Sequence, residues 1–268
     1  MNFKDKVVWI TGASSGIGEH FAYALADLGA KLILSSRNER ELQRVKNNCN
    51  NNLDVLTIPL DVAAFDTIPA AVKEAVAHFG SIHILINNAG VSQRSLIKDT
   101  TFEVDHRIMS INYLGTVAMT KAVLPVMIKQ QEGQIVVISS VMGKAGVPYR
   151  SAYAASKHAL HGYFDSLRSE VFRDNIKVTI ICPGYVRTNV TINALKGDGS
   201  KNNAMAVETS KGMDPAYFVQ KALRVIRQER EEVYIGGKEI LTIYVKRFLP
   251  NFFSFVVKRL NFKPEVAR

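Results

Sequence analysis

The chain has few residues that could carry disulfide or metal chemistry. It has only two cysteines in 268 residues, Cys49 and Cys182, so a disulfide framework is excluded and we expect both thiols to be reduced. Its six histidines show no ligand spacing such as H-E-x-x-H, and we therefore expect no metal site. No RNA-binding, zinc-finger or helix-turn-helix signature is present, which argues against a nucleic-acid partner.

Long apolar runs are also missing. No uninterrupted run approaches the ~18 residues of a membrane span, and no signal-peptide core follows the polar first six residues. These features predict a cytoplasmic protein. The net charge of +10 favours an anionic partner, such as nucleotide phosphates or a lipid surface.

What the sequence does contain is a regular alternation of short apolar runs and helical patterns. Strands are expected at 7–10, 31–36, 55–58, 82–86, 134–138, 178–181 and 233–235. Alternation of this kind predicts a parallel sheet with helices on both faces, and right-handed crossovers make it doubly wound. We therefore predict an α/β fold with a doubly wound, mostly parallel seven-stranded sheet as a single domain over residues 1–237. A C-terminal helical extension, 238–268, rich in apolar and basic residues, follows.

A glycine-rich turn, Thr11–Gly18, separates the first predicted strand from a helical pattern. In this context glycines let the backbone approach a pyrophosphate, which the N-terminus of the following helix attracts. Glu19 stands where a Walker loop needs lysine, so that loop is excluded. The remaining alternative is a plain turn.

The end of the second predicted strand bears on the choice of dinucleotide. Ser36 and Arg37 stand about 20 residues past the glycine turn, where an acid would bind the 2′-hydroxyl of NAD and an arginine would accommodate a 2′-phosphate. No acid is present there. Because arginine forms charge-assisted bonds to phosphate, we predict NADP(H) as the cofactor; the alternative is a solvated loop arginine.

Tyr153 and Lys157 are four residues apart and so share one face of a helix, which Ser151 is expected to open. A free phenol titrates near ~10, and a nearby ammonium favours the phenolate. The pair can therefore act as a general acid/base. Alone it is weakly specific, because a surface lysine packed over a helical tyrosine has the same spacing.

Several polar residues follow other predicted strands. Asp61 ends the third strand, where an adenine is expected, and the turn 87–90 (Asn-Asn-Ala-Gly) follows the fourth. Such a turn suits close cofactor approach, although by itself it is more often structural. Asn112 lies inside a long helical stretch, 104–130, and is either a satisfied core amide or a functional kink.

Taken together, these motifs resemble the short-chain dehydrogenase/reductase family over about residues 5–236. The matching motifs are Thr11-Gly12-x-x-x-Gly16-x-Gly18, Asn87-Asn88-Ala89-Gly90, Asn112, Ser140, Tyr153-x-x-x-Lys157 and Pro183-Gly184. Residues 150–159 and 183–185 look closest to the member 7B-like subgroup, which is related to the 11β-hydroxysteroid dehydrogenases. The resemblance implies a Rossmann-type NADP-binding domain and an oxidoreductase of carbonyls and alcohols.

The resemblance also implies roles. Tyr153 exchanges the proton of the carbonyl oxygen, Ser140 (rather than Ser139, by family spacing) holds that oxygen, and Lys157 lowers the pKa of Tyr153 and binds the nicotinamide ribose. Asn112 completes a proton path through a bound water. The expected cofactor contacts are Gly12, Ser14, Ser15, Gly16, Ile17, Gly18, Ser36, Arg37, Asp61, Val62, Asn88, Ala89, Gly90, Tyr153, Lys157, Pro183, Gly184, Val186 and Thr188.

Two later segments leave alternatives open. Residues 189–213 are too long for an ordinary connection and are either a lid or substrate loop or a disordered surface loop. The extension 238–268 carries seven Lys/Arg and two Glu, a net +5. It could close the substrate pocket or a subunit interface, lie on an anionic membrane, or do neither.

The function predicted is hydride transfer between NADP(H) and the carbonyl or secondary alcohol of a lipophilic small molecule. A non-catalytic NADP(H)-binding sensor or interaction protein on the same fold is the alternative, and the intact Ser140, Tyr153 and Lys157 argue against it. An extended-type epimerase or dehydratase would need a larger C-terminal substrate domain. The family is commonly dimeric or tetrameric, so a homodimer or homotetramer is expected, with peripheral membrane contact through 238–268 as a further possibility.

Overall fold

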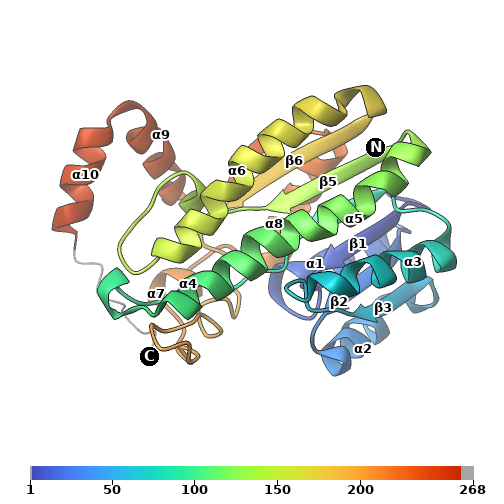
Figure 1. Ribbon diagram of the computed structural model, residues 1–268, viewed down its shortest axis with the longest axis horizontal. Helices are drawn as coiled ribbons and strands as arrows, with labels where there is room; N and C mark the ends of the chain where they lie inside the picture. Colours follow the sequence, from blue (N-terminus) through green and yellow to red (C-terminus); the bar gives the residue numbers. More distant parts are fainter. Residues whose placement is uncertain (1, 261–268) are drawn as a thin grey trace.

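All seven predicted strands form in the computed structural model, which describes residues 2–260 (Figure 1). They are β1 Val7–Thr11, β2 Lys31–Ser36, β3 Val55–Pro59, β4 Ile84–Asn87, β5 Gly133–Ile138, β6 Ile176–Pro183 and β7 Glu232–Ile235. Their order across the sheet is β3-β2-β1-β4-β5-β6-β7, and every neighbouring pair is parallel. The doubly wound fold is confirmed, with a sheet that is wholly rather than mostly parallel.

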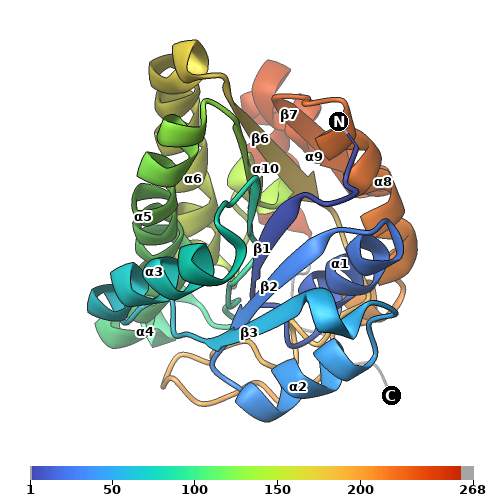
Figure 2. The same cartoon turned by 90° about the vertical axis from the view of Figure 1, so that its right-hand side faces the viewer.

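Helices cover both faces of the sheet, and two more follow the last strand at the C-terminal end of the chain. They are α1 Gly16–Asp27, α2 Glu39–Asn47, α3 Ile68–Phe79, α4 Phe102–Met109, α5 Gly115–Gln130, α6 Ser151–Val171, α7 Val207–Ser210, α8 Pro215–Arg227, α9 Leu241–Phe248 and α10 Pro250–Arg259. Single turns lie at Asn52–Asp54 (η1), Phe65–Thr67 (η2), Ile97–Asp99 (η3), Val141–Gly143 (η5), Phe172–Asp174 (η6) and Lys238–Ile240 (η7), and a π-helical segment at Ser110–Leu114 (η4). Figure 2 shows α3, α4, α5 and α6 on one side of the sheet and α1, α2 and α8 on the other.

Burial on both faces explains why the strands read as continuous apolar runs. In β1, Val8 and Ile10 pack in the core under α1 and α8, whereas Val7 and Trp9 pack in the core under α3, α5 and α6. Alternation of side chains therefore sends apolar groups to both faces. The indole Nε1 of Trp9 donates to Ser35 Oγ at 2.9 Å, so even its polar atom is satisfied. Each fully buried side chain of this size contributes about 1.5–3 kcal/mol.

The segments α4, η4 and α5 form one helix from Phe102 to Gln130. By length and composition this helix could cross a membrane. Met119, Val123 and Met127 on its inner side are fully buried in the core against the sheet, as expected for a core helix of this fold. The π-turn in its middle was not predicted.

The long connection after β6 is folded. Leu195 N donates to Ser92 O at 2.9 Å, Arg94 N donates to Leu195 O at 2.8 Å, and Thr101 N donates to Gly197 O at 2.9 Å. The segment 189–213 is therefore fastened to the connection between β4 and α4. The structure thus shows an ordered segment, not the disordered alternative.

The C-terminal helices α9 and α10 stand at one end of the molecule (Figure 1), where the Tyr244 ring of α9 contacts the Tyr234 ring of β7. Pro250 is the first residue of α10 and divides the two helices, as the sequence predicted. The rest of the predicted extension, 261–268, lies outside the described residues. Cys49 and Cys182 are buried free thiols.

Candidate active site

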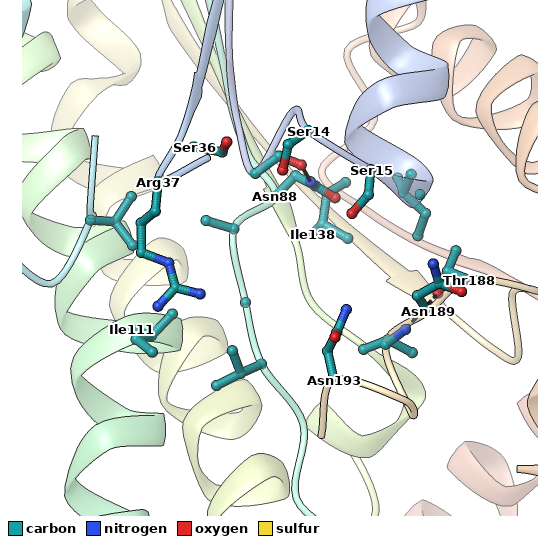
Figure 3. Close-up of a pocket in the computed structure, with 18 of the residues that line it drawn as sticks. Ser14, Ser15, Ser36, Arg37, Asn88, Ile111, Ile138, Thr188, Asn189 and Asn193 are labelled. Carbon is teal, nitrogen blue, oxygen red and sulfur yellow. Dashed lines mark hydrogen bonds between the residues drawn. The ribbon is translucent and has the colours of Figure 1, made fainter. Parts of the chain in front are cut away.

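A cleft of about 1090 Å³ opens at the carboxyl ends of the strands. It spans the point between β1 and β4 where the strand order reverses, which is where doubly wound sheets bind ligands. Figure 3 shows Ser14, Ser15 and Asn88 on one side of this cleft and Asn189 and Asn193 on another.

The glycine turn leaves the cleft floor free of side chains. Gly12 and Gly16 have φ of +66° and +58°. A Cβ on Gly12 would lie 2.9 Å from Ala89 Cα, and one on Gly18 would lie 2.3 Å from Gly12 O. Ser15, the N-cap of α1, makes no side-chain cap bond. Bare backbone at a helix N-terminus fits a pyrophosphate, so this cradle suits a dinucleotide.

Asn88 and Thr11 lock the cradle to the neighbouring strand. Asn88 Nδ2 donates to Thr11 O at 3.0 Å and to Gly12 O at 3.1 Å. In return, Thr11 Oγ1 accepts from Asn88 N at 3.0 Å and from Ala89 N at 3.1 Å. The sequence placed Thr11 in the turn without giving it this role. Its hydroxyl joins the two turns that the cofactor residues occupy.

The end of β2 forms one wall of the cleft. Arg37 is exposed, and its side chain extends across the cleft towards Ile111 (Figure 3). The Ser36 hydroxyl accepts from Asn38 N at 3.3 Å. Glu41 also lines this wall, but Arg44 pairs with it at 2.7 Å, which offsets its negative charge. Arg37 is therefore a cation available to an anionic group at this position.

Ser140 and Tyr153 meet at the end of β5. Ser140 Oγ accepts from Met142 N at 3.1 Å, which fixes the hydroxyl at the mouth of the cleft. Burial raises the pKa of Tyr153 above its ordinary value, while a side-chain hydrogen bond with Ser140 and the charge of Arg150 act in the opposite direction. The structure thus brings this serine and this tyrosine together.

Lys157 lies one helical turn from Tyr153, as the spacing predicted. Its Nζ donates to Ile138 O at 2.8 Å and lies 5.8 Å from the centroid of the Tyr153 ring. Burial lowers the pKa of Lys157 to about 8. The expected lowering of the Tyr153 pKa by this ammonium is therefore not the dominant effect here; desolvation of the phenol is larger.

Asn112 lies in the π-turn, beneath the cleft. Its side chain accepts from Val91 N at 2.8 Å and donates to Val91 O at 2.9 Å and to Ser156 Oγ at 3.0 Å. A Cβ on Gly90 would lie 3.2 Å from Asn112 Oδ1 and 3.7 Å from Lys157 Nζ. The first sequence alternative, a satisfied core amide, is therefore present, in a helix whose local geometry is π-helical; a functional role for Asn112 stays a prediction.

Ser139 also lines the cleft, but its hydroxyl is engaged by another residue. Its Oγ lies 3.0 Å from His161 Nε2, and His161 Nδ1 donates to Glu232 Oε2 at 3.0 Å. A Cβ on Gly143 would lie 2.6 Å from Ser139 Oγ, so this hydroxyl is enclosed. Of the two serines, Ser140 is the one that acts on the pKa of Tyr153, which it lowers.

Comparison with known proteins places this geometry in a family. The family model "short chain dehydrogenase" matches residues 6–198, more than half of the sequence. The chain belongs to the short-chain dehydrogenase family. The family predicted from the motifs is thereby confirmed.

Individual members of the short-chain dehydrogenase family match most of the chain. Human dehydrogenase/reductase SDR family member 7 is 41% identical over 266 residues, covering 97% of this chain and 78% of the relative. Zebrafish member 7B (Danio rerio) is 43% identical over 257 residues, covering 93% and 83%. A short-chain dehydrogenase/reductase from Burkholderia phymatum, solved in complex with NAD, has the same fold with a TM-score of 0.82 at 23% identity over the full length of both chains.

Most residues predicted for this short-chain dehydrogenase converge on the cleft. Of the predicted cofactor contacts, all except Gly18 line it, and so do Ser140, Tyr153 and Lys157. Gly18 instead packs against Gly12, and Asn112 packs behind Gly90. The roles of these residues stay predictions.

The cleft also has lining residues that the sequence did not point to. They are Asn38, Glu39, Glu41, Leu60, Val91, Arg107, Ile111, Ile138, Asn189, Val190, Asn193, Leu195, Gly199 and Lys201. Six of them, from Asn189 to Lys201, belong to the segment 189–213, whose unusual length had marked it as a candidate substrate loop. Arg107 lies five residues before Asn112 in the same long helix, but nothing in its own sequence context marked it.

Proposed function

We propose that the protein is an NADP(H)-dependent carbonyl reductase or alcohol dehydrogenase acting on a lipophilic small molecule. The supporting observation is the meeting of Ser140, Tyr153 and Lys157 in the cleft that also contains the glycine cradle. A proton donor beside a dinucleotide site suits hydride chemistry, because the carbonyl oxygen gains a proton as its carbon gains the hydride. A nucleotide sensor would need the cradle but no such donor.

In this proposal, nicotinamide supplies or accepts the hydride when bound. Tyr153 gives its phenolic proton to the carbonyl oxygen in reduction and takes it back in oxidation. Ser140, fixed by Met142 N, donates a hydrogen bond to the same oxygen. Arg150 and Ser140 favour the Tyr153 phenolate and so work against the burial that raises its pKa.

Lys157 and Asn112 are proposed to restore the proton. Lys157 Nζ is buried and bonds to Ile138 O. A Cβ added to Gly90 would lie close to both Lys157 Nζ and Asn112 Oδ1, so the two side chains border the same glycine. From there its ammonium would grip the nicotinamide ribose and favour the phenolate. Asn112, through a water, would connect the lysine to solvent.

Substitution of Tyr153 tests the reaction. Tyr153→Phe removes the proton donor and keeps the ring, so kcat on a reducible ketone should fall about 100-fold or more, while NADPH affinity stays within about twofold. Turnover is followed by NADPH absorbance, over a panel of lipophilic ketones, aldehydes and alcohols. Tyr163→Phe, on the same helix, is the matched control. Near-wild-type turnover by Tyr153→Phe would contradict the role proposed for Tyr153.

The NADP(H) preference rests on Arg37. Fluorescence titration should show NADPH binding at least about tenfold more tightly than NADH, because a charge-assisted bond to the 2′-phosphate is lost with NADH. Arg37→Gln should reduce that ratio towards one, and Arg40→Gln, also exposed in this region, should not. Tighter binding of NADH by the wild-type protein would contradict the preference.

We also propose a cytoplasmic homodimer or homotetramer that attaches reversibly to membranes through α9 and α10. Within residues 2–260, no cleft-lining residue comes from 238–260, so this structure gives no support to pocket closure by the extension. The exposed aromatic and basic side chains of α9 and α10 support the membrane alternative.

A further inference from the structure

A buried arginine beside the active site lacks a close anionic partner. The Arg94 side chain is only 9% exposed. Among residues 2–260, neither its Nε nor its Nη2 has a hydrogen-bond partner. The ion pair with Glu208 is long, with 3.9 Å between Arg94 Nη2 and Glu208 Oε2. Hydrogen bonds at this distance do not form, so the guanidinium is desolvated without full compensation.

A second arginine shares the same environment. Arg150 directly precedes α6, and its Nη1 donates to Ser92 Oγ. Burial and the charge of Arg94 lower the pKa of Arg150 to about 10, while Tyr153, Tyr185 and Glu208 act to raise it. Because Arg150 bonds to Ser92, two residues before Arg94, the two guanidinium groups belong to the same largely desolvated region, where each positive charge disfavours the other. Such an arrangement costs stability unless an anion joins it.

Arg94 and Arg150 do not line the cleft themselves, but each adjoins residues that do. Ser92 and Arg94 both hydrogen-bond to Leu195, which lines the cleft, and Arg150 lies three residues before Tyr153. Glu208 belongs to the short helix α7 of the segment 189–213, and its side chain is 48% exposed. An exposed carboxylate at 3.9 Å is a loose counterion that another carboxylate can replace.

We propose that Arg94 and Arg150 bind a carboxylate group of the substrate, which displaces the side chain of Glu208. Because Arg150 lies three residues before Tyr153 and Arg94 bonds through its backbone to the cleft residue Leu195, the substrate class would be an oxo-carboxylic acid, or the matching hydroxy acid, with its carbonyl at Tyr153 and its acid group at the arginines. Two guanidinium groups match the two oxygens of a carboxylate. This inference deepens the proposed function and rests on it for the reaction, although not for the binding.

Binding of an unreactive acid tests the arginine site directly. Titration calorimetry on the full chain should give decanoate at least about tenfold tighter binding than decanamide, since only the acid forms charge-assisted bonds. Arg94→Gln should abolish that difference and Arg94→Lys should keep part of it. Lys98→Gln, an exposed cation in the same connection, is the control. Equal affinity for decanoate and decanamide in the wild-type protein would overturn the inference.

Glu208 provides the opposite test. If its carboxylate competes with the ligand, Glu208→Gln should tighten decanoate binding by about threefold or more, because an internal competitor is removed. Unchanged or weaker binding would show that Glu208 is no competitor. In turnover of medium-chain oxo acids and their methyl esters, the acid-to-ester ratio of kcat/KM should fall about tenfold in Arg94→Gln.

Stability separates a binding role from a structural one. A buried cation kept for a ligand should cost stability, so Arg94→Met should raise the thermal midpoint while removing decanoate selectivity. A lowered midpoint would mean that Arg94 serves the fold and would contradict the inference. Turnover of esters without any preference for acids would refute the carboxylate site and leave the reductase intact. Selective decanoate binding without turnover of any carbonyl compound would refute the proposed reductase and leave the carboxylate site intact.

Discussion

Among the carboxylates of the described residues, Glu232 has the most strongly shifted pKa. It accepts hydrogen bonds from His161 Nδ1 at 3.0 Å, from Lys144 Nζ at 2.8 Å and from the Tyr234 hydroxyl. Burial raises the pKa of Glu232, but these three bonds together outweigh it and lower that pKa to about 2. The carboxylate therefore ties β7 to α6 and, through His161, to Ser139, the neighbour of Ser140.

A pH dependence of stability follows. The folded-state pKa lies below the ordinary value of 4.5, so the contribution of Glu232 is fully present above pH 4.5 and is lost as pH falls from there towards about 2. Thermal midpoints measured across this range should fall less steeply in Glu232→Gln than in the wild-type protein. Glu231→Gln, its exposed neighbour, should behave like the wild type. Parallel curves for all three proteins would contradict this assignment.

Single residues were predictable from sequence where one motif carries the chemistry. Tyr153 and Lys157 are four residues apart, and the glycine turn spans eight residues. Each motif can therefore be recognised from a short stretch of sequence. The bonds of Thr11 with Asn88 and of His161 with Glu232 join residues 77 and 71 positions apart. The near approach of Arg94 to Glu208 likewise exists only in the fold. The raised pKa of Tyr153 could not be predicted either, because it depends on tertiary burial.

Helix α6 carries Tyr153 and Lys157, and a glutamine from another segment fixes where it begins. Gln93 is fully buried, and its Oε1 accepts from Ala152 N at 2.8 Å in the first turn of α6. Its Nε2 donates to Ser95 Oγ at 3.2 Å and to Thr100 Oγ1 at 3.1 Å. The first N–H groups of a helix have no intrahelical partner, so this amide replaces a conventional cap.

Replacing this amide should loosen the catalytic helix. Gln93→Met keeps the volume and leaves Ala152 N unpaired, which should reduce the free energy of unfolding by about 1–3 kcal/mol. Because Tyr153 directly follows Ala152, whose N–H loses its partner, kcat should fall as well, with NADPH affinity retained. Gln228→Met, at the exposed end of α8, should change neither quantity. Unaltered kcat in Gln93→Met would show that the helix start does not position the tyrosine.

Elements were predictable to the extent that their pattern is local. The strands appear as apolar runs because both faces are buried, and Pro250 and Gly29 mark helix boundaries by their own backbone preferences. The π-turn around Asn112 was not predictable, since its extra residue is held by contacts with Val91 and Ser156. The folding of 189–213 depends in the same way on distant partners such as Ser92.

The molecule as a whole has an uneven surface. The α9–α10 end exposes a set of large apolar side chains. Two other apolar residues of these helices, Ile243 and Phe253, are buried. The exposed set is Leu241, Tyr244, Phe248, Leu249, Phe252, Phe255 and Leu260. Lys246, Arg247, Lys258 and Arg259 lie among them. Apolar groups interleaved with cations match the boundary of an anionic bilayer, where the apolar groups enter and the cations meet headgroups.

Co-sedimentation with vesicles tests this surface. The full chain should bind phosphatidylserine-containing vesicles more tightly than pure phosphatidylcholine vesicles. Replacing Lys246, Arg247, Lys258 and Arg259 together by glutamine should weaken binding about tenfold or more, since each cation near such a surface contributes about 1 kcal/mol.

Charge-matched controls separate a lipid surface from a subunit interface. Replacing the exposed cations Arg40, Lys73, Lys121 and Lys129, which lie elsewhere on the molecule, should leave vesicle binding nearly unchanged. Phe248→Ser with Phe252→Ser should also weaken vesicle binding, because both side chains are more than half exposed. If these two changes instead split an oligomer in analytical ultracentrifugation and leave vesicle binding intact, the surface joins subunits. The apolar side chains would then be covered by a second copy of the chain, and the membrane proposal would fail.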